Sequence, residues 1–255
     1  MHILLVGLGN MGNKYFWKLE HMGEKLVLCD IDPTKDRRTH PFYCHFGDVR
    51  EDLRAVVVAV DPKEHVRIAS EFLQRGIPVL LEKPPALSSV EFESIKDFKN
   101  LYISEVESYS VCADFIRKPE RFLKVERFGK GRGYLSPLWD LAWHDLYLLQ
   151  KISHNFSFDA LKIEDGVWSL YGHLEGVPIV LSVAWEHPKP RRVWYVDDDL
   201  VLDFGEERVY KGGRLLREDK RDKLKLMIED FLIGSFDRGS VERAYQNLKT
   251  LEKTL

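Results

Sequence analysis

Residues 3–16, which read ILLVGLGNMGNKYF, decide the fold of the first part of the chain. The apolar run that ends at Gly7 is typical of a buried parallel strand, and the residues from Met11 on repeat with a helical period. Gly7 permits a tight turn, Gly9 lets the backbone approach a pyrophosphate, and Gly12 lets the helix pack closely on the strand. The same glycine pattern occurs in ordinary turns, so its meaning depends on the rest of the sequence.

Strand-like and helix-like patterns alternate through the first half of the chain. The strand-like runs cover residues 2–7, 25–32, 42–47, 55–60, 78–83 and 101–106, and the helical stretches cover residues 11–22, 62–76 and 88–98. Such alternation with short connections predicts a parallel sheet covered by helices on both faces.

The pattern changes after about residue 112. One helix is expected over residues 137–152, and two more close the chain at about 219–234 and 240–254. Between them, turn residues separate strand-like runs at 166–176, 178–187, 191–205 and 207–213. We therefore predict an α/β protein with a doubly wound Rossmann sheet in residues 1–112. Residues 113–255 are expected to form a smaller α+β domain with an open, mostly antiparallel sheet, whose final helices can pack back on the first domain.

Composition limits the class of protein. With 255 residues, 44% of them hydrophobic and 31% charged, the chain is typical of a globular protein with a substantial core. A formal net charge of -3 gives no reason to expect nucleic acid as a partner, and the apolar runs are too short to cross a membrane. The three cysteines include no C-x-x-C pair, which argues against a disulfide framework or a zinc site and favours a cytoplasmic location.

The strand predicted after the first helix indicates which ligand the glycine loop binds. It ends in Asp30, where a carboxylate can accept hydrogen bonds from the adenosine ribose and repel a 2'-phosphate. This favours NAD, while Arg37 and Arg38 just downstream keep NADP possible. The alternative is a glycine turn without a ligand. The residues expected to hold the dinucleotide here are Gly7, Gly9, Asn10, Met11, Gly12 and Asp30.

The segment LLEKPPAL, residues 80–87, follows the fifth predicted strand. Ligands of parallel sheets lie beyond the carboxyl ends of the strands, so Glu82 and Lys83 are expected at the cofactor crevice. Lys83 can then project towards the nicotinamide. A charged strand end stopped by two prolines is the simpler interpretation of this segment taken alone.

The segment WDLAWHDLYLL, residues 139–149, carries the second candidate group. Asp140 and His144 are four residues apart and share one face of a helix, with Tyr147 one step further along. A carboxylate beside an imidazole suits a base that removes a proton from an alcohol while hydride leaves the same carbon. An ordinary polar helix face is the alternative. Because His65 and His173 are scattered, no clear third ligand is present, and no metal site is expected.

Together, GLGNMG, AVVVAVDPKEHVRIASEFLQRGIPVLLEKPPAL and WDLAWHDLYLL resemble the Gfo/Idh/MocA oxidoreductase family, over residues 1–95 and 135–152. The resemblance implies a Rossmann domain, a second α/β domain with an open sheet that often forms a dimer surface, and substrate bound between them. It implies that Lys83 orients the reacting hydroxyl and that Asp140 and His144 bind substrate and assist proton transfer. It further implies that the turn with Asp61, Pro62 and His65 lines the cofactor.

The chain departs from the family pattern at several places. Ala142 replaces the usual Gly in D-x-G-x-H, and Asp61 replaces the usual Thr or Asn before Pro62. The segment EVESYSVCADF after the sixth predicted strand lacks the usual Arg and Pro, and Tyr109 stands near their expected position. The chain is also short for the family.

The sequence predicts an NAD(P)-dependent dehydrogenase or reductase that acts on the CH–OH group of a sugar, polyol or related small molecule, working as a homo-oligomer. In this hypothesis His144 takes the hydroxyl proton, Asp140 orients His144 or a substrate hydroxyl, and Lys83 hydrogen-bonds the reacting oxygen. One alternative is an NAD-binding sensor without turnover, and another is a reductase for a non-sugar carbonyl compound.

Overall fold

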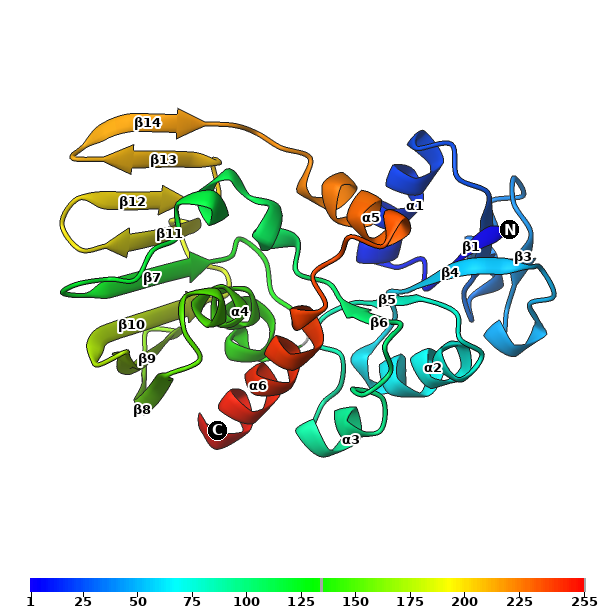
Figure 1. Ribbon diagram of the computed structural model, residues 1–255, viewed down its shortest axis with the longest axis horizontal. Helices are drawn as coiled ribbons and strands as arrows, with labels where there is room; N and C mark the ends of the chain where they lie inside the picture. Colours follow the sequence, from blue (N-terminus) through cyan, green and yellow to red (C-terminus); the bar gives the residue numbers. More distant parts are fainter. Residues whose placement is uncertain (134, 255) are drawn as a thin grey trace. The chain divides into compact units, whose positions relative to one another are not determined.

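The computed structural model describes residues 1–133 and 135–254 (Figure 1). Contacts divide the chain into two compact units. Unit 1 consists of Met1–Ser104 and Leu224–Leu248, and unit 2 consists of Glu105–Lys223 with the C-terminal residues from Lys249 on. The predicted boundary at residue 112 separates a cofactor-binding domain from a substrate-binding domain. It stays a prediction, because the division by contacts does not show what each part binds.

Unit 1 contains a six-stranded parallel sheet in the order β3-β2-β1-β4-β5-β6. Its strands are β1 His2–Val6, β2 Leu26–Cys29, β3 Phe42–Tyr43, β4 Leu53–Val58, β5 Val79–Leu81 and β6 Leu101–Ile103. This order confirms the predicted doubly wound Rossmann sheet. The strand order reverses between β1 and β4, and such sheets bind their ligands at the carboxyl ends of the strands at this point.

Helices α1 Asn10–His21, α2 Pro62–Gln74 and α3 Ser89–Glu93 connect these strands. The expected helix over 88–98 is therefore shorter than predicted. The hydroxyl of Ser94 donates to the carbonyl of Glu91 at 2.8 Å, which offers the backbone an alternative to a continued helix. Short 3₁₀ turns cover Pro33–Lys35 and Phe46–Asp48.

The C-terminal helices α5 Lys223–Ile233 and α6 Gly239–Thr254 contribute to unit 1 through their residues up to Leu248. They pack beside the edge strand β6. The ring of Tyr102 lies 5.5 Å from that of Phe231 and 5.6 Å from that of Phe236, and the Ile103 N–H donates to the Ser240 hydroxyl at 3.2 Å. These contacts cover an edge that would otherwise be open.

Unit 2 contains an eight-stranded sheet in the order β14-β13-β12-β11-β7-β10-β9-β8. Neighbouring strands are antiparallel except β7 and β10, which confirms the predicted mostly antiparallel sheet. The strands are β7 Leu123–Phe128, β8 Phe156–Glu164, β9 Val167–Leu174, β10 Val177–Ala184, β11 Arg191–Val196, β12 Leu200–Asp203, β13 Arg208–Lys211 and β14 Arg214–Glu218. The patterns above missed β7, β8 and β14, because β8 and β14 are exposed edge strands and β7 carries buried charges.

The segment expected to be one helix over 137–152 has two parts. A π-helical turn over Leu138–Ala142 precedes helix α4 Trp143–Ile152, so the prediction of a single α-helix is wrong at its start. Trp143 and Leu148 are buried and anchor α4 in the core of unit 2. Two 3₁₀ turns, Val106–Tyr109 and Val111–Phe115, also belong to unit 2.

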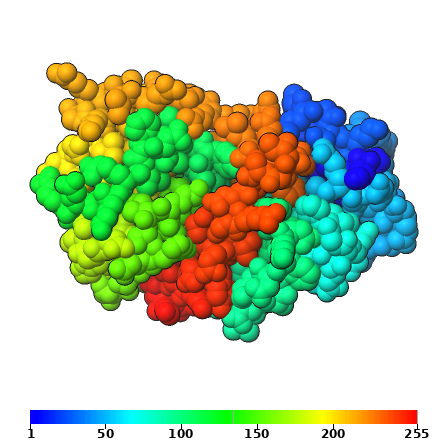
Figure 2. All heavy atoms as spheres, viewed as in Figure 1, coloured from blue at the N-terminus to red at the C-terminus, as the bar shows by residue number. Residues whose placement is uncertain are grey.

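Several large apolar side chains are exposed on the sheet of unit 2, namely those of Ile163, Tyr171, Leu215 and Leu216. The β14 segment, orange in Figure 2, lies open at the end of the sheet. The expected homo-oligomer stays a prediction. Within residues 1–133 and 135–254, the structure contains no helix long and apolar enough to span a membrane.

Candidate functional site

The glycine loop joins β1 to α1. Gly7 has φ +93°, and a Cβ there would lie 2.4 Å from the Ala59 carbonyl oxygen. A Cβ on Gly12 would lie 1.9 Å from the Gly7 carbonyl oxygen, so the helix can pack on the loop only with glycine at this position. The two glycines therefore permit the compact turn that the sequence predicts.

The start of α1 fits a dinucleotide pyrophosphate. Gly9 precedes Asn10, the first residue of α1, and glycine has no side chain with which to cap the first helical N–H groups. A Cβ on Gly9 would meet no atom of the described residues within 4 Å, so the backbone at this point is open to a ligand. N–H groups at a helix N-terminus, with the helix dipole behind them, bind phosphate.

Asp30, at the end of β2, holds the same loop. Its carboxylate accepts the Leu8 N–H at 2.7 Å and the Asp32 N–H at 2.9 Å. Each carboxylate oxygen has two lone pairs, so a ribose hydroxyl can still be accepted. Arg37 lies nearby, hydrogen-bonded to the side chain of Asn13, whose amide in turn donates to the Leu8 carbonyl. The loop, the carboxylate and a guanidinium thus lie within one hydrogen-bonded group.

The turn after β4 contributes Asp61, Pro62 and His65. Asp61 caps α2 by accepting the Lys63 N–H at 3.0 Å, and Pro62 is the first helical residue. His65 is buried, with Nδ1 2.8 Å from the Pro84 carbonyl oxygen and Nε2 3.1 Å from that of Val60.

Burial lowers the pKa of His65 to about 4, so its ring is neutral at physiological pH and carries one N–H. The shorter contact, to Pro84, takes this hydrogen. His65 therefore ties the turn after β4 to the segment after β5.

The segment after β5 carries Glu82 and Lys83. The hydroxyl of Tyr15, on α1, donates to Glu82 at 2.5 Å, and the Lys83 N–H donates to the same carboxylate at 3.1 Å. Glu82 is buried and joins α1 to the end of β5, whereas Lys83 is half-buried. The structure thus brings the loop, Asp30, His65 and Glu82 to the carboxyl end of one sheet.

The second predicted group lies in unit 2, on the π-helical turn and α4. Asp140 is on the turn, and a Cβ on Gly133 would lie 2.7 Å from its Oδ2, so this glycine leaves room for the carboxylate. Nδ1 of His144 lies 3.2 Å from the hydroxyl of Tyr147, and the two rings meet edge to face with centroids 5.8 Å apart. Single turns of π-helix occur frequently at functional sites.

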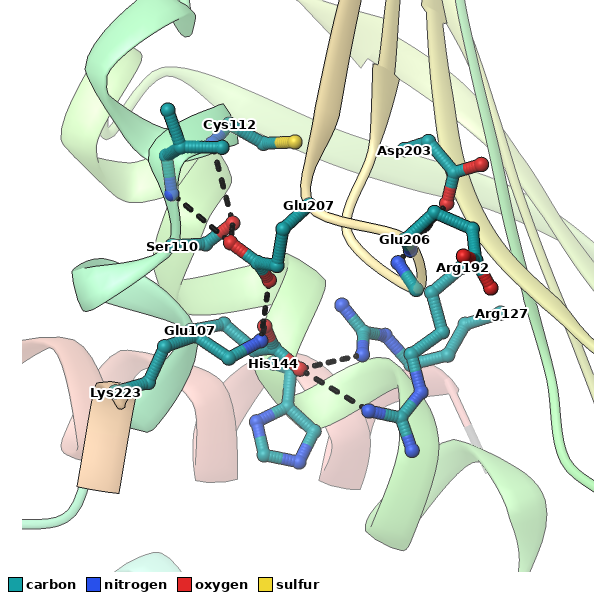
Figure 3. Close-up of polar contacts among 12 residues, drawn as sticks. Glu107, Ser110, Cys112, Arg127, His144, Arg192, Asp203, Glu206, Glu207 and Lys223 are labelled. Carbon is teal, nitrogen blue, oxygen red and sulfur yellow. Dashed lines mark hydrogen bonds and ion pairs between the residues drawn. The ribbon is translucent and has the colours of Figure 1, made fainter. Parts of the chain in front are cut away.

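Charged side chains, most of them buried, form a group around Glu107 (Figure 3). Arg127 on β7 binds Asp145 in a bidentate manner, at 2.7 and 3.0 Å, and reaches Glu107 at 3.2 Å. Lys223 joins Glu107 to Glu207, with 2.7 Å to each carboxylate. The backbone N–H of Glu107 donates to the Tyr147 oxygen at 2.9 Å, which links this charge group to His144.

The neighbouring charges favour the ionised forms of Glu107 and Arg127. Burial opposes ionisation of Glu107, but the positive charges of Arg127, Lys223 and Arg192 outweigh it and lower the pKa of its carboxyl. Burial also disfavours the guanidinium of Arg127, yet the charges of Asp145 and Glu107 hold its pKa above its usual value. The indole of Trp194 donates a further hydrogen bond to Asp145 at 2.8 Å.

Sequence patterns did not identify Glu107, Arg127 or Lys223 as part of a site. The signal that could have found Arg127 is a pair of charges, Glu126 and Arg127, inside an otherwise apolar strand. Tyr109 lies in the 3₁₀ turn that also contains Glu107. Among residues 1–133 and 135–254 there is no group of three or more His, Cys, Asp or Glu that could hold a metal ion.

Comparison with known proteins agrees with this geometry. Residues 1–105 match the family model GFO_IDH_MocA, described as oxidoreductase family, NAD-binding Rossmann fold. This match confirms the resemblance for the first part of the chain, and the description of the matching model names NAD binding. Comparison with curated protein sequences gave no match.

Solved structures share the fold over the whole chain. UDP-N-acetylglucosamine 3-dehydrogenase from Acidithiobacillus ferrooxidans has a TM-score of 0.85 at 19% identity, covering 100% of this chain and 96% of that one. Myo-inositol 2-dehydrogenase from Lactobacillus plantarum has a TM-score of 0.80 at 15% identity, and the match covers 99% of this chain and 95% of that one. A 3-ketoreductase from Actinomadura kijaniata, in complex with TDP-benzene and NADP, has a TM-score of 0.83 at 14% identity. The match covers 100% of this chain and 96% of that one. At these identities the likeness shows the fold alone.

Proposed function

We propose that this protein, whose first 105 residues carry the NAD-binding Rossmann fold of the Gfo/Idh/MocA oxidoreductases, is an NAD(P)-dependent dehydrogenase or reductase acting on a CH–OH group. The observation that carries the proposal is the uncapped start of α1 behind the glycine loop, with Asp30 beside it. A sugar, polyol or related small molecule is the substrate class. The names of the similar solved structures, two sugar or polyol dehydrogenases and a 3-ketoreductase, support this class.

In this proposal unit 1 binds the cofactor. The N–H groups at Asn10 and Met11 bind the pyrophosphate, and Asp30 accepts the ribose hydroxyls. Asp61, Pro62, His65 and Glu82 shape the crevice. The bound nicotinamide supplies the hydride chemistry, and the chain's own residues supply position and charge.

The residues that serve the reacting oxygen are Lys83, Asp140 and His144. Lys83 stabilises negative charge that develops on this oxygen, Asp140 orients the substrate, and His144 hydrogen-bonds the same oxygen. These roles, and the expectation that the three residues act together, remain proposals. The roles of Lys83 and His144 are tested separately, because each of these two residues is changed alone.

The test measures cofactor absorbance with NAD and NADP against a panel of sugars, polyols and ketoses. Lys83→Ala and His144→Ala should each lower kcat by about 100- to 10,000-fold, since positioned acid–base groups contribute this much. Their dissociation constants for NAD, measured by calorimetry, should stay unchanged. Lys99→Ala and His173→Ala, which change exposed residues outside the proposed site, are the matched controls.

Two results would contradict the proposal. Normal turnover in both variants would refute the assigned roles. Measurable NAD binding by the wild type without turnover of any panel member would favour the alternative, an NAD-binding sensor.

A further inference from the structure

Tyr147 contacts both the backbone of Glu107 and the ring of His144. It follows His144 by three residues on α4, which places the two side chains on neighbouring turns of the same face. Its side chain is buried, its oxygen lies 2.9 Å from the Glu107 nitrogen, and the same oxygen lies 3.2 Å from Nδ1 of His144. The phenol oxygen therefore has two neighbours, and the donor of each contact can be assigned.

The contact with Glu107 has only one possible direction. A peptide N–H is always a donor, so it occupies a lone pair of the Tyr147 oxygen. The phenol hydrogen then needs an acceptor of its own. Among residues 1–133 and 135–254, Nδ1 of His144 is the acceptor within hydrogen-bond distance of this hydroxyl.

Tyr147 keeps its hydrogen over the working range of pH. Burial raises its pKa well above the usual value, and the negative charges of Glu107 and Glu105 raise it further. The positive charge of Arg127 acts in the opposite direction but does not outweigh them. The hydroxyl is therefore a constant donor towards His144.

From this geometry we infer that Tyr147 is a positioning residue that fixes the tautomer of His144, with Nδ1 as the acceptor and the hydrogen on Nε2. The inference rests on the proposed function for its catalytic meaning. If Nδ1 also carried a hydrogen, that hydrogen would face the hydrogen of the Tyr147 hydroxyl. The buried hydroxyl would then have no acceptor, so the neutral ring is favoured. His144 then presents an N–H, not a lone pair, at Nε2.

The fixed tautomer changes the expected chemistry of His144. A neutral imidazole with hydrogen on Nε2 polarises a carbonyl, or stabilises an alkoxide, by donating a hydrogen bond. It does not accept a proton at that nitrogen. When an alcohol is oxidised, the hydride leaves carbon for the nicotinamide, and the hydroxyl proton passes to another base. This base is a water molecule, which becomes hydronium, while Lys83 stabilises the negative charge on the reacting oxygen as in the proposed function. This assignment replaces the sequence-based expectation that His144 is the base.

Nuclear magnetic resonance of the imidazole nitrogens tests the tautomer directly. Nitrogen-15-labelled full-length protein near neutral pH should show His144 with a protonated Nε2 and an unprotonated Nδ1. The His144→Gln variant assigns the signals by their loss. The Tyr147→Phe variant keeps the ring and removes the hydroxyl, so His144 should become a mixture of tautomers. Tyr102→Phe, which changes another buried tyrosine, is the matched control and should leave the His144 signals unmoved.

The kinetic readout is a split between kcat and KM. Tyr147→Phe should lower kcat by about tenfold, the effect of one misdirected hydrogen bond, with KM unchanged. A proton on Nδ1 in the wild type, or an unchanged His144 spectrum in Tyr147→Phe, would overturn the inference. If Tyr147→Phe does not fold, the wild-type spectrum alone decides.

The spectrum needs neither cofactor nor substrate. A protein that shows this tautomer but turns over no alcohol or ketone contradicts the proposed function alone. An active enzyme with its hydrogen on Nδ1 contradicts this inference alone.

Discussion

The buried ring of His65 makes the stability of the protein depend on pH. Burial lowers the pKa of His65 from 6.5 to about 4, so the unfolded chain binds a proton at this position before the folded chain does. The stability that the neutral ring contributes is therefore fully present above about pH 7.5 and is lost as the pH falls from about 6.5 to about 4. Linkage over this interval gives a loss of about 2 kcal/mol by about pH 5.

Urea denaturation of the wild type and of His65→Asn isolates this contribution. Asparagine has an amide N–H near the position of Nδ1 and can still donate to the Pro84 carbonyl, but it does not titrate. The carboxylates of the protein titrate in both proteins and cancel in the difference. The free energy of unfolding of the wild type minus that of the variant should thus fall by about 2 kcal/mol between about pH 7.5 and pH 5.

His173→Asn is the control for this experiment. His173 is exposed, so its variant shows the effect of replacing a histidine by asparagine away from the buried ring. If His65→Asn follows the wild type in parallel, the imidazole is not held neutral by burial, and the interpretation of both its ring contacts is wrong.

Three further results are expected. Gly12→Ala places a Cβ 1.9 Å from the Gly7 carbonyl oxygen, so calorimetry should show at least tenfold weaker NAD binding, and unchanged binding would contradict the close packing. Asp30→Ala removes the acceptor of the Leu8 N–H and a negative charge, so the ratio of NADP to NAD affinity should rise about tenfold or more, and a constant ratio would refute the ribose assignment. Burial opposes ionisation of Asp197, but backbone N–H groups of residues 120–122 and a guanidinium hold its pKa at about 2. Asp197→Asn should therefore destabilise the protein at neutral pH, and the difference in thermal midpoint should shrink as the pH falls from about 4 to 2.

The local part of the fold could be predicted from the sequence because its signals lie within short segments. The apolar run 3–6, the glycines after it and the apolar run 55–58 specify neighbouring buried strands, and the structure pairs β1 with β4. The position of Asp30 directly after β2 could be predicted because the end of a strand is visible in the sequence, and its place at a cofactor crevice stays a prediction. The hydrogen bond that Asp30 accepts from the Leu8 N–H depends on how the loop folds, and no pattern in the sequence indicates it.

The charge group in unit 2 could not be predicted because its partners are distant in the sequence. Arg127 binds Asp145, eighteen residues later, and Lys223 binds Glu107, 116 residues earlier. No periodicity relates such positions. The π-helical turn at Leu138–Ala142 was missed for a related reason, since the same residues fit an α-helical period equally well.

The buried charges do more for position than for stability. A buried ion pair recovers little more than the desolvation free energy of its two charges, so the group is weak evidence for a stable core. It does fix the backbone. The carboxylate of Glu107 is held by Arg127 and Lys223, and the N–H of the same residue is thereby presented to the Tyr147 oxygen at 2.9 Å. Because this N–H directs the phenol hydrogen towards His144, the charge group and the imidazole form one continuous arrangement. An apolar group of the same volume would fill the space, but it would not hold Glu107 in place to direct that hydrogen.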